Sequence, residues 1–197
     1  MWWARLLNVI SGLLSGAGAP ASTTSYESIA TVTVGSGGQS SISFTSIPST
    51  YKHLQVRWIA RTNRANALDA IDLQFNSDTS QGNYVRHELD GNGASASSSA
   101  GYPQSGNYPY WITYVAGNNA TSGVFGAGVI DILDYANTNK YKTSRSLGGY
   151  DNNGSGYVNL FSHLYMVTTA ISSLQLTSSL ASGFQEYSKF ALYGIKG

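Results

Sequence analysis

The stretch HLQVRWIAR, residues 53–61, decides the fold class of this chain. Its apolar and polar side chains alternate one by one, which places them on opposite faces of a β-strand. The apolar members are Leu54, Val56, Trp58 and Ala60, and the polar members are His53, Gln55, Arg57 and Arg61. The stretch IDLQFN, residues 71–76, repeats the pattern after a short NRAN connection. Two such stretches predict a sheet with one face in a core and the other towards solvent.

Further runs of strand composition follow along the chain, separated by clusters of Gly, Asn and Ser. We expect strands at 26–34, 41–44, 84–89, 109–115, 124–134, 141–147, 157–168, 173–177 and 184–195. Many short strands with no helical pattern between them predict an all-β fold, an antiparallel β-sandwich of jelly-roll-like order, and exclude a parallel α/β fold. The polar segments 90–107 and 117–123 are expected to be loops at the ends of the sandwich, where binding function tends to sit.

The N-terminal segment has a different pattern, because its apolar residues recur at helical spacing. We expect residues 1–18 to form a short hydrophobic helix, residues 19–25 a linker, and residues 26–197 the sandwich domain. A docking helix would bury these apolar side chains in a partner: Trp2, Trp3, Leu6, Leu7, Ile10, Leu13 and Leu14. Two alternatives stay open: a signal peptide, since small residues follow the apolar run, and a membrane segment, although the stretch is marginal for a span.

The composition excludes several classes of function. Charged residues make up 11% of the chain and the formal net charge is +1, so no long-range field attracts nucleic acid. The chain has no cysteine, which excludes disulfides, thiolate catalysis and cysteine-bound metals. A composition with few charged residues and many Gly, Ser, Thr, Asn and Tyr is typical of adhesins, lectins and virion surface proteins.

Catalytic motifs fail on their spacing. No serine lies in a Gly-x-Ser-x-Gly elbow, and no glycine-rich phosphate loop is present. The pair His87-Glu88 lacks the second histidine of a zinc protease, and the other histidines, His53 and His163, are expected to be structural. Asp131 and Asp134 are three apart on one expected strand and therefore point to opposite faces, so they cannot act together on a glycosidic bond. We expect a protein that is not an enzyme.

Two oxygen-rich turns are the candidates for a metal. These are Asp90-Gly-Asn-Gly and Asp151-Asn-Asn-Gly, whose oxygens suit calcium. Neither has the spacing of an EF-hand loop, and turns rich in Asn and Asp are common without metal. The sequence therefore predicts no cofactor, and bound metal in purified protein would revive a calcium site.

Aromatic residues are the better functional clue. Tyr102, Tyr108, Tyr110 and Trp111 flank the long polar segment 90–107. Flat rings with polar groups nearby suit the stacking of a sugar, and tyrosines between subunits would give the same pattern. We therefore expect these four residues to contact a glycan or a neighbouring subunit, and plain burial in the core is the alternative.

Both ends of the expected domain resemble a known family. The stretch YESIATVTVGSGGQSSISFTSIPSTYKHLQVRWIART with the following NRAN and IDLQFN, and the ending ISSLQLTSSLASGFQEYSKFALYGIKG, are similar to β-sandwich proteins encoded by tailed bacteriophages. The resemblance covers about residues 26–197 and implies a virion structural protein, often of tail-fibre type, with no catalytic residues. The N-terminal segment is not part of this pattern.

Together these observations predict a surface appendage of a phage particle. Its N-terminal helix would dock to other virion proteins of the tail or capsid, and its sandwich would lie on the virion surface and contact a host surface glycan. We expect a symmetric homo-oligomer, a homotrimer first, and no nucleic-acid partner. A tail-fibre module and a capsid decoration protein both fit. A secreted or envelope-anchored glycan-binding module of lectin type is the alternative, and an enzyme acting on host polysaccharide comes last.

Overall fold

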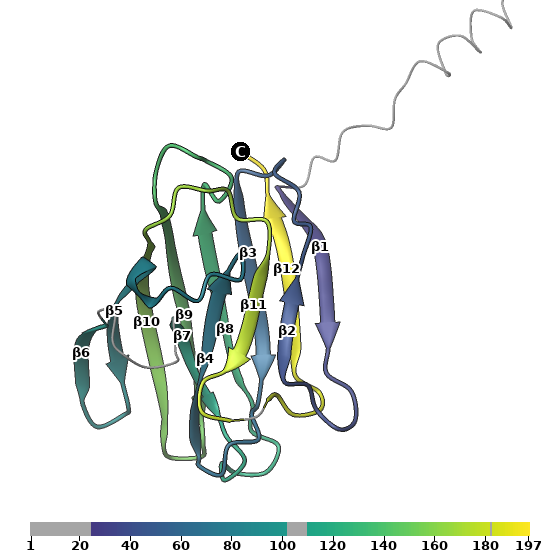
Figure 1. Cartoon of the computed structure of the whole chain (residues 1–197). Helices are drawn as coiled ribbons and strands as arrows, with labels where there is room; N and C mark the ends of the chain where they lie inside the picture. The colour runs from purple at the N-terminus through teal and green to yellow at the C-terminus, as the bar shows by residue number, and fades with distance from the viewer. Residues whose placement is uncertain (1–24, 102–109, 182) are drawn as a thin grey trace, which may run out of the picture.

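The computed structural model of the protein describes residues 25–101, 110–181 and 183–197. These residues form two antiparallel sheets that pack face to face as a β-sandwich (Figure 1). The large sheet has the order β1-β12-β3-β8-β9-β10-β5-β6, and the small sheet has the order β2-β11-β4-β7. The all-β antiparallel sandwich predicted from the sequence is therefore confirmed.

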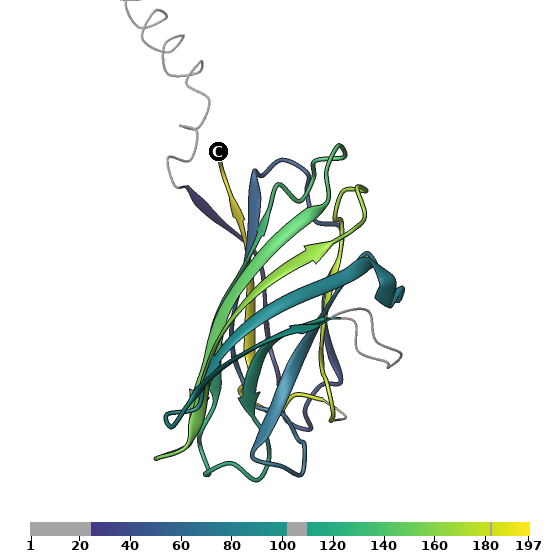
Figure 2. The same ribbon diagram turned by 90° about the vertical axis from the view of Figure 1, so that its left-hand side faces the viewer.

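The strands are β1 (Tyr26–Thr33), β2 (Ser41–Phe44), β3 (His53–Ala60), β4 (Leu68–Phe75), β5 (Tyr84–Gly91), β6 (Ala96–Gly101), β7 (Trp111–Ala116), β8 (Gly126–Leu133), β9 (Lys142–Asp151), β10 (Gly156–Tyr165), β11 (Leu174–Ser178) and β12 (Lys189–Ile195). A 3-10 turn, η1 (Gln81–Asn83), precedes β5. The strands of both sheets run along the length of the domain (Figure 2). Tyr26 pairs with Ile195, so the domain begins and ends at the same end of the molecule.

The core lies between the sheets, as the alternation in β3 predicts. Leu54, Val56, Trp58 and Ala60 are all buried and point towards the small sheet. From β4, Ile71, Leu73 and Phe75 belong to the same core.

Arg61 corrects one expectation from the same stretch. The sequence places this residue on the solvent face, but the side chain is buried. Its guanidinium donates hydrogen bonds to the carbonyls of Asn118, Ala120, Thr121 and Val124. A buried cation must be hydrogen-bonded, and here it organises the loop after β7.

Two strand predictions are wrong in detail. The segment 90–107, expected as a loop, contains β6, which pairs with β5. Its sequence ASSSAG has no apolar alternation, because β6 is an edge strand with mostly exposed side chains. The last strand begins at Lys189 and not at 184, because a turn at Glu186 and Tyr187, with φ 71 at Tyr187, separates it from Phe184, which forms only isolated bridges.

The two sheets differ in width, and this difference leaves part of the inner face of the large sheet uncovered. The edge strand β7 packs against β8, β9 and β10, while β5 and β6 continue the large sheet beyond it (Figure 1). The inner face of β5 is therefore only partly covered by the small sheet. The expected N-terminal helix, residues 1–18, lies outside the described residues.

Candidate functional site

A groove lies where the small sheet ends above β5. Its volume is about 410 Å³, and residues of β4, β5, β6, β7 and β10 contribute to it. We call it the β5–β7 groove; it is lined by Arg64, Leu68, Asp69, Ala70, Glu88, Asp90, Ser97, Trp111, Tyr114, Tyr157 and Leu180.

One wall of the groove is aromatic. The rings of Trp111 and Tyr114 lie edge to face at 6.1 Å, and those of Tyr114 and Tyr157 do so at 5.4 Å. Trp111 is fixed at both sides, because its Nε1 donates to Ser179 Oγ at 2.7 Å and the Arg86 guanidinium lies 4.4 Å from its ring centroid. A cation on one face of the indole leaves the ring orientation well defined.

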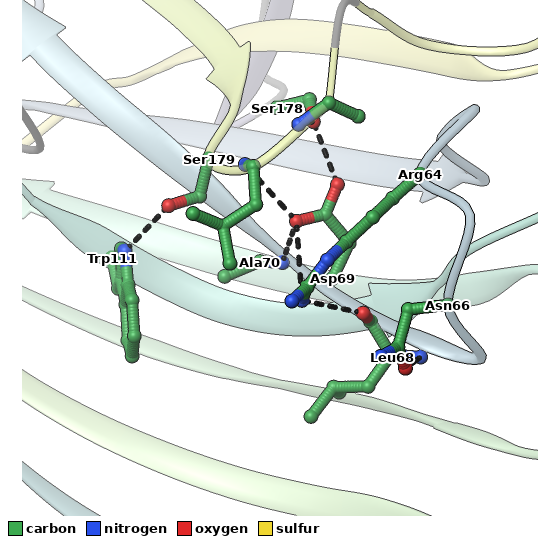
Figure 3. A network of polar contacts seen from close by, with 10 residues as sticks. Arg64, Asn66, Leu68, Asp69, Ala70, Trp111, Ser178 and Ser179 are labelled. Carbon is green, nitrogen blue, oxygen red and sulfur yellow. Dashed lines mark hydrogen bonds and ion pairs between the residues drawn. The ribbon is translucent and has the colours of Figure 1, made fainter.

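Asp69 supports the floor of the groove through a buried network (Figure 3). Its carboxylate accepts hydrogen bonds from Ser178 Oγ at 2.6 Å, from the Ala70 amide at 2.8 Å and from the Leu180 amide at 3.2 Å. Arg64 Nη1 lies 4.0 Å from the same carboxylate and donates to the Leu68 carbonyl. Since its oxygens are occupied by protein donors, Asp69 is a structural carboxylate that holds β4 and the end of β11 together.

The opposite wall comes from β5, where every second residue faces the groove. Glu88 accepts hydrogen bonds from Ser99 Oγ at 2.6 Å and from Arg86 Nε at 3.1 Å. Asp90 has a buried oxygen without a hydrogen-bond partner among the described residues. Burial, followed by the charge of Glu88, raises the pKa of Asp90 to about 6.

Two buried titratable groups lie behind this site. Burial raises the pKa of Asp72 to about 7, while a hydrogen bond from Ser179 acts in the opposite direction. Burial lowers the pKa of His163 to about 4, although its Nε2 is hydrogen-bonded to the Trp111 carbonyl at 2.9 Å. Both groups therefore touch residues that position Trp111, and both favour their neutral forms.

The arrangement suits binding better than hydrolysis. Cleavage of a glycosidic bond needs two carboxyl groups on opposite sides of the bond. Glu88 and Asp90 come from the same wall, and Asp69 on the other side already accepts its protein hydrogen bonds. An apolar ring surface beside a few fixed polar groups is instead the usual make-up of a site that holds a small ligand.

The residues predicted from the sequence have different fates. Trp111 lines the groove, whereas Tyr110 is only 1% exposed and packs against Phe75, Tyr84 and His163 in the core. Adjacent residues of a strand point to opposite faces, so Tyr110 offers no surface to a glycan or a subunit, and its expected role is corrected. Tyr102 and Tyr108 lie outside the described residues, as do the docking residues Trp2, Trp3, Leu6, Leu7, Ile10, Leu13 and Leu14.

The sequence pattern did not point to the polar members of the groove as a glycan site. Asp90 stood out only as a possible calcium ligand in its turn, and Glu88 only as part of the pair His87-Glu88. Asp69, Glu88 and Asp90 look like ordinary solvent-facing residues in their strands, and the groove forms only when β5 and β7 are brought together. A signal was present in β5, where Arg86, Glu88 and Asp90 share one face. Their role depends on the width of the small sheet, which the sequence does not encode locally.

The other candidates for chemistry are structural. Asp131 accepts a hydrogen bond from Gln55, and Asp134, just after β8, forms ion pairs with Lys52 and Lys140. His53 Nδ1 accepts from the Asp134 amide. The oxygens of Asn92 and Asp151 accept hydrogen bonds within their own turns. Within the described parts of the chain, no three His, Asp or Glu side chains are grouped so as to hold a metal.

Comparisons with known proteins give little further information. No protein-family model and no curated protein matches the chain. Among solved structures, the crystal structure of the galectin LEC-6 of Caenorhabditis elegans is similar with a TM-score of 0.31 and 7% identity, over 85% of this chain and 96% of that one. A likeness at this level carries no argument about function. Across residues 25–101, 110–181 and 183–197, no helix has the length and apolar character needed to cross a membrane.

Proposed function

We propose that this chain is a glycan-binding structural protein of a phage particle, which binds a host surface glycan in the β5–β7 groove and catalyses no reaction. The observation that carries the binding role is the groove itself, with Trp111, Tyr114 and Tyr157 beside Glu88 and Asp90. Pyranose rings present apolar C–H faces and a rim of hydroxyls. The groove offers both partners for such a ring, an aromatic wall and acceptors for hydroxyl groups.

The charges in the groove favour a neutral or amino-bearing sugar. Asp69, Glu88 and Asp90 line it, and Arg64 is the one cation among its lining residues. A sugar acid would bring its own carboxylate against these groups, which costs free energy in a partly desolvated site. Asp90 is neutral below pH about 6 and can then donate a hydrogen bond to a sugar oxygen.

The virion role is supported by the resemblance of residues 26–76 and 171–197 to phage β-sandwich proteins and by the low charge of the chain. In this proposal the sandwich has jelly-roll-like connectivity and residues 1–18 dock to other virion proteins. Particles purified from the encoding phage should contain the chain, and quantitative mass spectrometry should give its number of copies. Hundreds of copies would identify a decoration protein and a few would identify a tail appendage, whereas absence from the particle would leave the secreted or envelope-anchored lectin.

Glycan binding is tested with the full chain on an array of bacterial lipopolysaccharides and capsular polysaccharides. We expect binding of a neutral or amino-sugar glycan, and a loss of about 10-fold or more in affinity for Trp111→Ala and for Tyr157→Ala, since each removes a stacking surface worth about 1.4 kcal/mol. Tyr187→Ala is the matched control, because Tyr187 is exposed and precedes β12, five strands away from β5 in the large sheet. No bound glycan, or equal losses in all three variants, would contradict the proposal.

A further inference from the structure

The outer face of the large sheet is unusually apolar for a surface. Side chains that alternate with the core residues point outwards, and several of them are large aliphatic groups. Those about half exposed are Ile59 (49%), Leu89 (53%), Leu147 (53%), Val158 (58%) and Leu160 (47%). Because they come from β3, β5, β9 and β10, they are not isolated surface residues but parts of one face.

The register of the strands joins them into a continuous stripe. Val129 of β8 pairs with Leu147 of β9, Leu147 pairs with Leu160 of β10, and Leu160 pairs with Leu89 of β5. Directly paired residues share a face, so these four side chains form one row across four strands. A hollow of about 260 Å³ lined by Leu89, Leu147, Val158 and Leu160 lies beside the row.

The size of this face fits a protein interface. From β3 to β6 it spans five strand spacings, about 24 Å, and an eight-residue strand is about 27 Å long. The resulting area of about 650 Å² is of the order of the 800 Å² that each partner contributes to a standard interface. This is the area of the whole face with its polar row; the aliphatic row and the hollow beside it are its apolar part, and apolar patches on soluble proteins mark interaction sites.

We propose that this face binds a second copy of the same chain, with a two-fold axis that runs parallel to the strands between β9 and β10. The axis lies there because the row of four aliphatic residues is centred between Leu147 and Leu160. Rotation about this axis keeps the position of a residue along the strand direction and inverts its position across the sheet. Each row of one copy therefore faces the same row of the second copy, with the strands in reverse order. Consequently β9 faces β10 of the second copy, and β8 faces β5 of the second copy.

The register of the paired strands then makes the two faces complementary. Leu147 meets Leu160 of the second copy, and Val129 meets Leu89 of the second copy. In the next row, Val158 meets Gly149 of the second copy, which cannot carry a side chain because a Cβ would collide with the Tyr157 carbonyl. The side chain of Val158 thus packs over a glycine that leaves space for it.

The polar rim is complementary as well. Asp131, Arg145, Ser162 and His87 form the row beside the aliphatic one. Under the same axis Asp131 meets His87 of the second copy, and Arg145 meets Ser162 of the second copy. A carboxylate faces an imidazole and no two like charges face each other, which favours this partner over an unrelated apolar surface.

Such a dimer leaves glycan binding free. The β5–β7 groove opens on the inner side of β5, and the contact uses the outer side of the same sheet. The dimer would present two grooves, so that the binding of a repetitive glycan gains from two linked sites. The homotrimer expected from the sequence needs no two-fold contact. The mass of the purified protein in solution therefore distinguishes a dimer from a trimer.

The first test measures the mass of the full chain by light scattering coupled to size exclusion. We expect twice the chain mass of 21.0 kDa, and a shift to the monomer for Leu147→Arg and for Leu160→Arg, which place two cations in the centre of the contact. Tyr187→Arg adds the same charge elsewhere and should leave the dimer intact. A monomeric wild-type chain, a trimer, or a dimer that both arginine variants retain would overturn the proposal, provided that thermal unfolding shows the variants folded.

The second test measures the register and does not depend on losing the dimer. The chain has no cysteine, so Leu147→Cys and Leu160→Cys each introduce a single reactive thiol. A short bis-maleimide that matches the separation of about 10 Å between packed sheets should cross-link a Leu147→Cys copy to a Leu160→Cys copy after mixing. Leu133→Cys, near the end of the same face, should react poorly with Leu147→Cys, and an equal yield for both pairs would contradict the proposed axis.

Discussion

The inner face of the large sheet has two halves that differ in chemistry. On β12, β3 and β8 it is aliphatic and aromatic, with Phe190, Leu192, Val56 and Ile130 fully covered by the small sheet. On β9 and β10 the same layer carries the buried polar groups Lys142, Ser144, Ser146, Asn159 and His163, and on β5 it carries the partly buried Arg86, Glu88 and Asp90. One sheet therefore serves as a core on one side and as a polar support on the other.

The polar half exists because the small sheet ends above it. Ser146 Oγ donates to the Ile112 carbonyl at 2.5 Å, and His163 Nε2 is hydrogen-bonded to the Trp111 carbonyl. The edge strand β7 is irregular at this point, since its register with β4 shifts between Ile71 and Asp72. Side chains of the large sheet thus replace hydrogen bonds that a further strand would make, and they fix the strand that carries Trp111.

The largest expected effect belongs to the apolar half. Phe190→Ala removes a buried ring that packs against Phe184 at 4.8 Å and should lower the free energy of unfolding by about 3–5 kcal/mol. Because no titratable group is involved, the loss should be the same at pH 4, 5.5 and 7, as measured by urea unfolding. Tyr187→Ala should change stability by less than about 0.5 kcal/mol. A loss that varies with pH would break the distinction between the halves.

The polar half should instead respond to pH, in opposite directions at two residues. His163 has a lowered pKa of about 4, so it stabilises the fold less as pH falls from 6.5 to 4, where only the unfolded chain binds the proton. Asp72 has a raised pKa of about 7, so stability is lost as pH rises from 3.8 to 7, where only the unfolded chain loses the proton. The two effects oppose each other in the wild type.

Single variants should separate them. Asp72→Asn removes the Asp72 effect, so its stability relative to that of the wild type should rise by about 3 kcal/mol between pH 4 and 7, because Asp90, which titrates near pH 6, contributes equally to both chains. His163→Gln removes the His163 effect, so its stability relative to that of the wild type should fall by about 3 kcal/mol over the same range. Urea unfolding at each pH checks the difference between the two variants, which removes contributions common to both. Parallel profiles would mean that neither group is buried in its neutral form.

A smaller effect is expected at the contact that orients the groove. Ser179→Ala removes the acceptor of the Trp111 indole hydrogen bond and should cost about 1 kcal/mol of stability. Glycan affinity should fall several-fold, since the ring is less well fixed, whereas Ser36→Ala in the exposed turn after β1 should affect neither quantity. Unchanged affinity in Ser179→Ala would show that the orientation of Trp111 does not matter for binding.

The sequence predicts the apolar half of the molecule better than the polar half. Alternation in residues 53–60 and 71–75 correctly places Val56, Trp58 and Leu73 in the core, because their burial follows from strand periodicity alone. The groove depends on which strands become neighbours and on where the small sheet stops. Residues as distant as Asp69 and Tyr157 meet there, and no local spacing encodes that contact.

The neighbours Tyr110 and Trp111 also show that local sequence does not determine which residue reaches the groove. Both were expected at one contact site, although neighbours in an extended segment point to opposite sides, and the sequence does not tell which of the two enters the core. Tyr110 is buried in an aromatic cluster, and its hydroxyl is paired with Ser144 Oγ at 3.0 Å, a partner supplied by β9 in the other sheet. Trp111 is thereby turned towards the groove.

The most direct test of glycan binding follows the indole signals of the ¹⁵N-labelled full chain by NMR while a glycan bound on the array is added. The chain has four tryptophans, and their indole N–H groups give separate signals. We predict that the Trp111 signal shifts in proportion to the bound fraction, while the signal of Trp58, buried in the core, stays in place. Saturable binding that leaves the Trp111 signal unchanged would contradict the assignment of the β5–β7 groove as the glycan site.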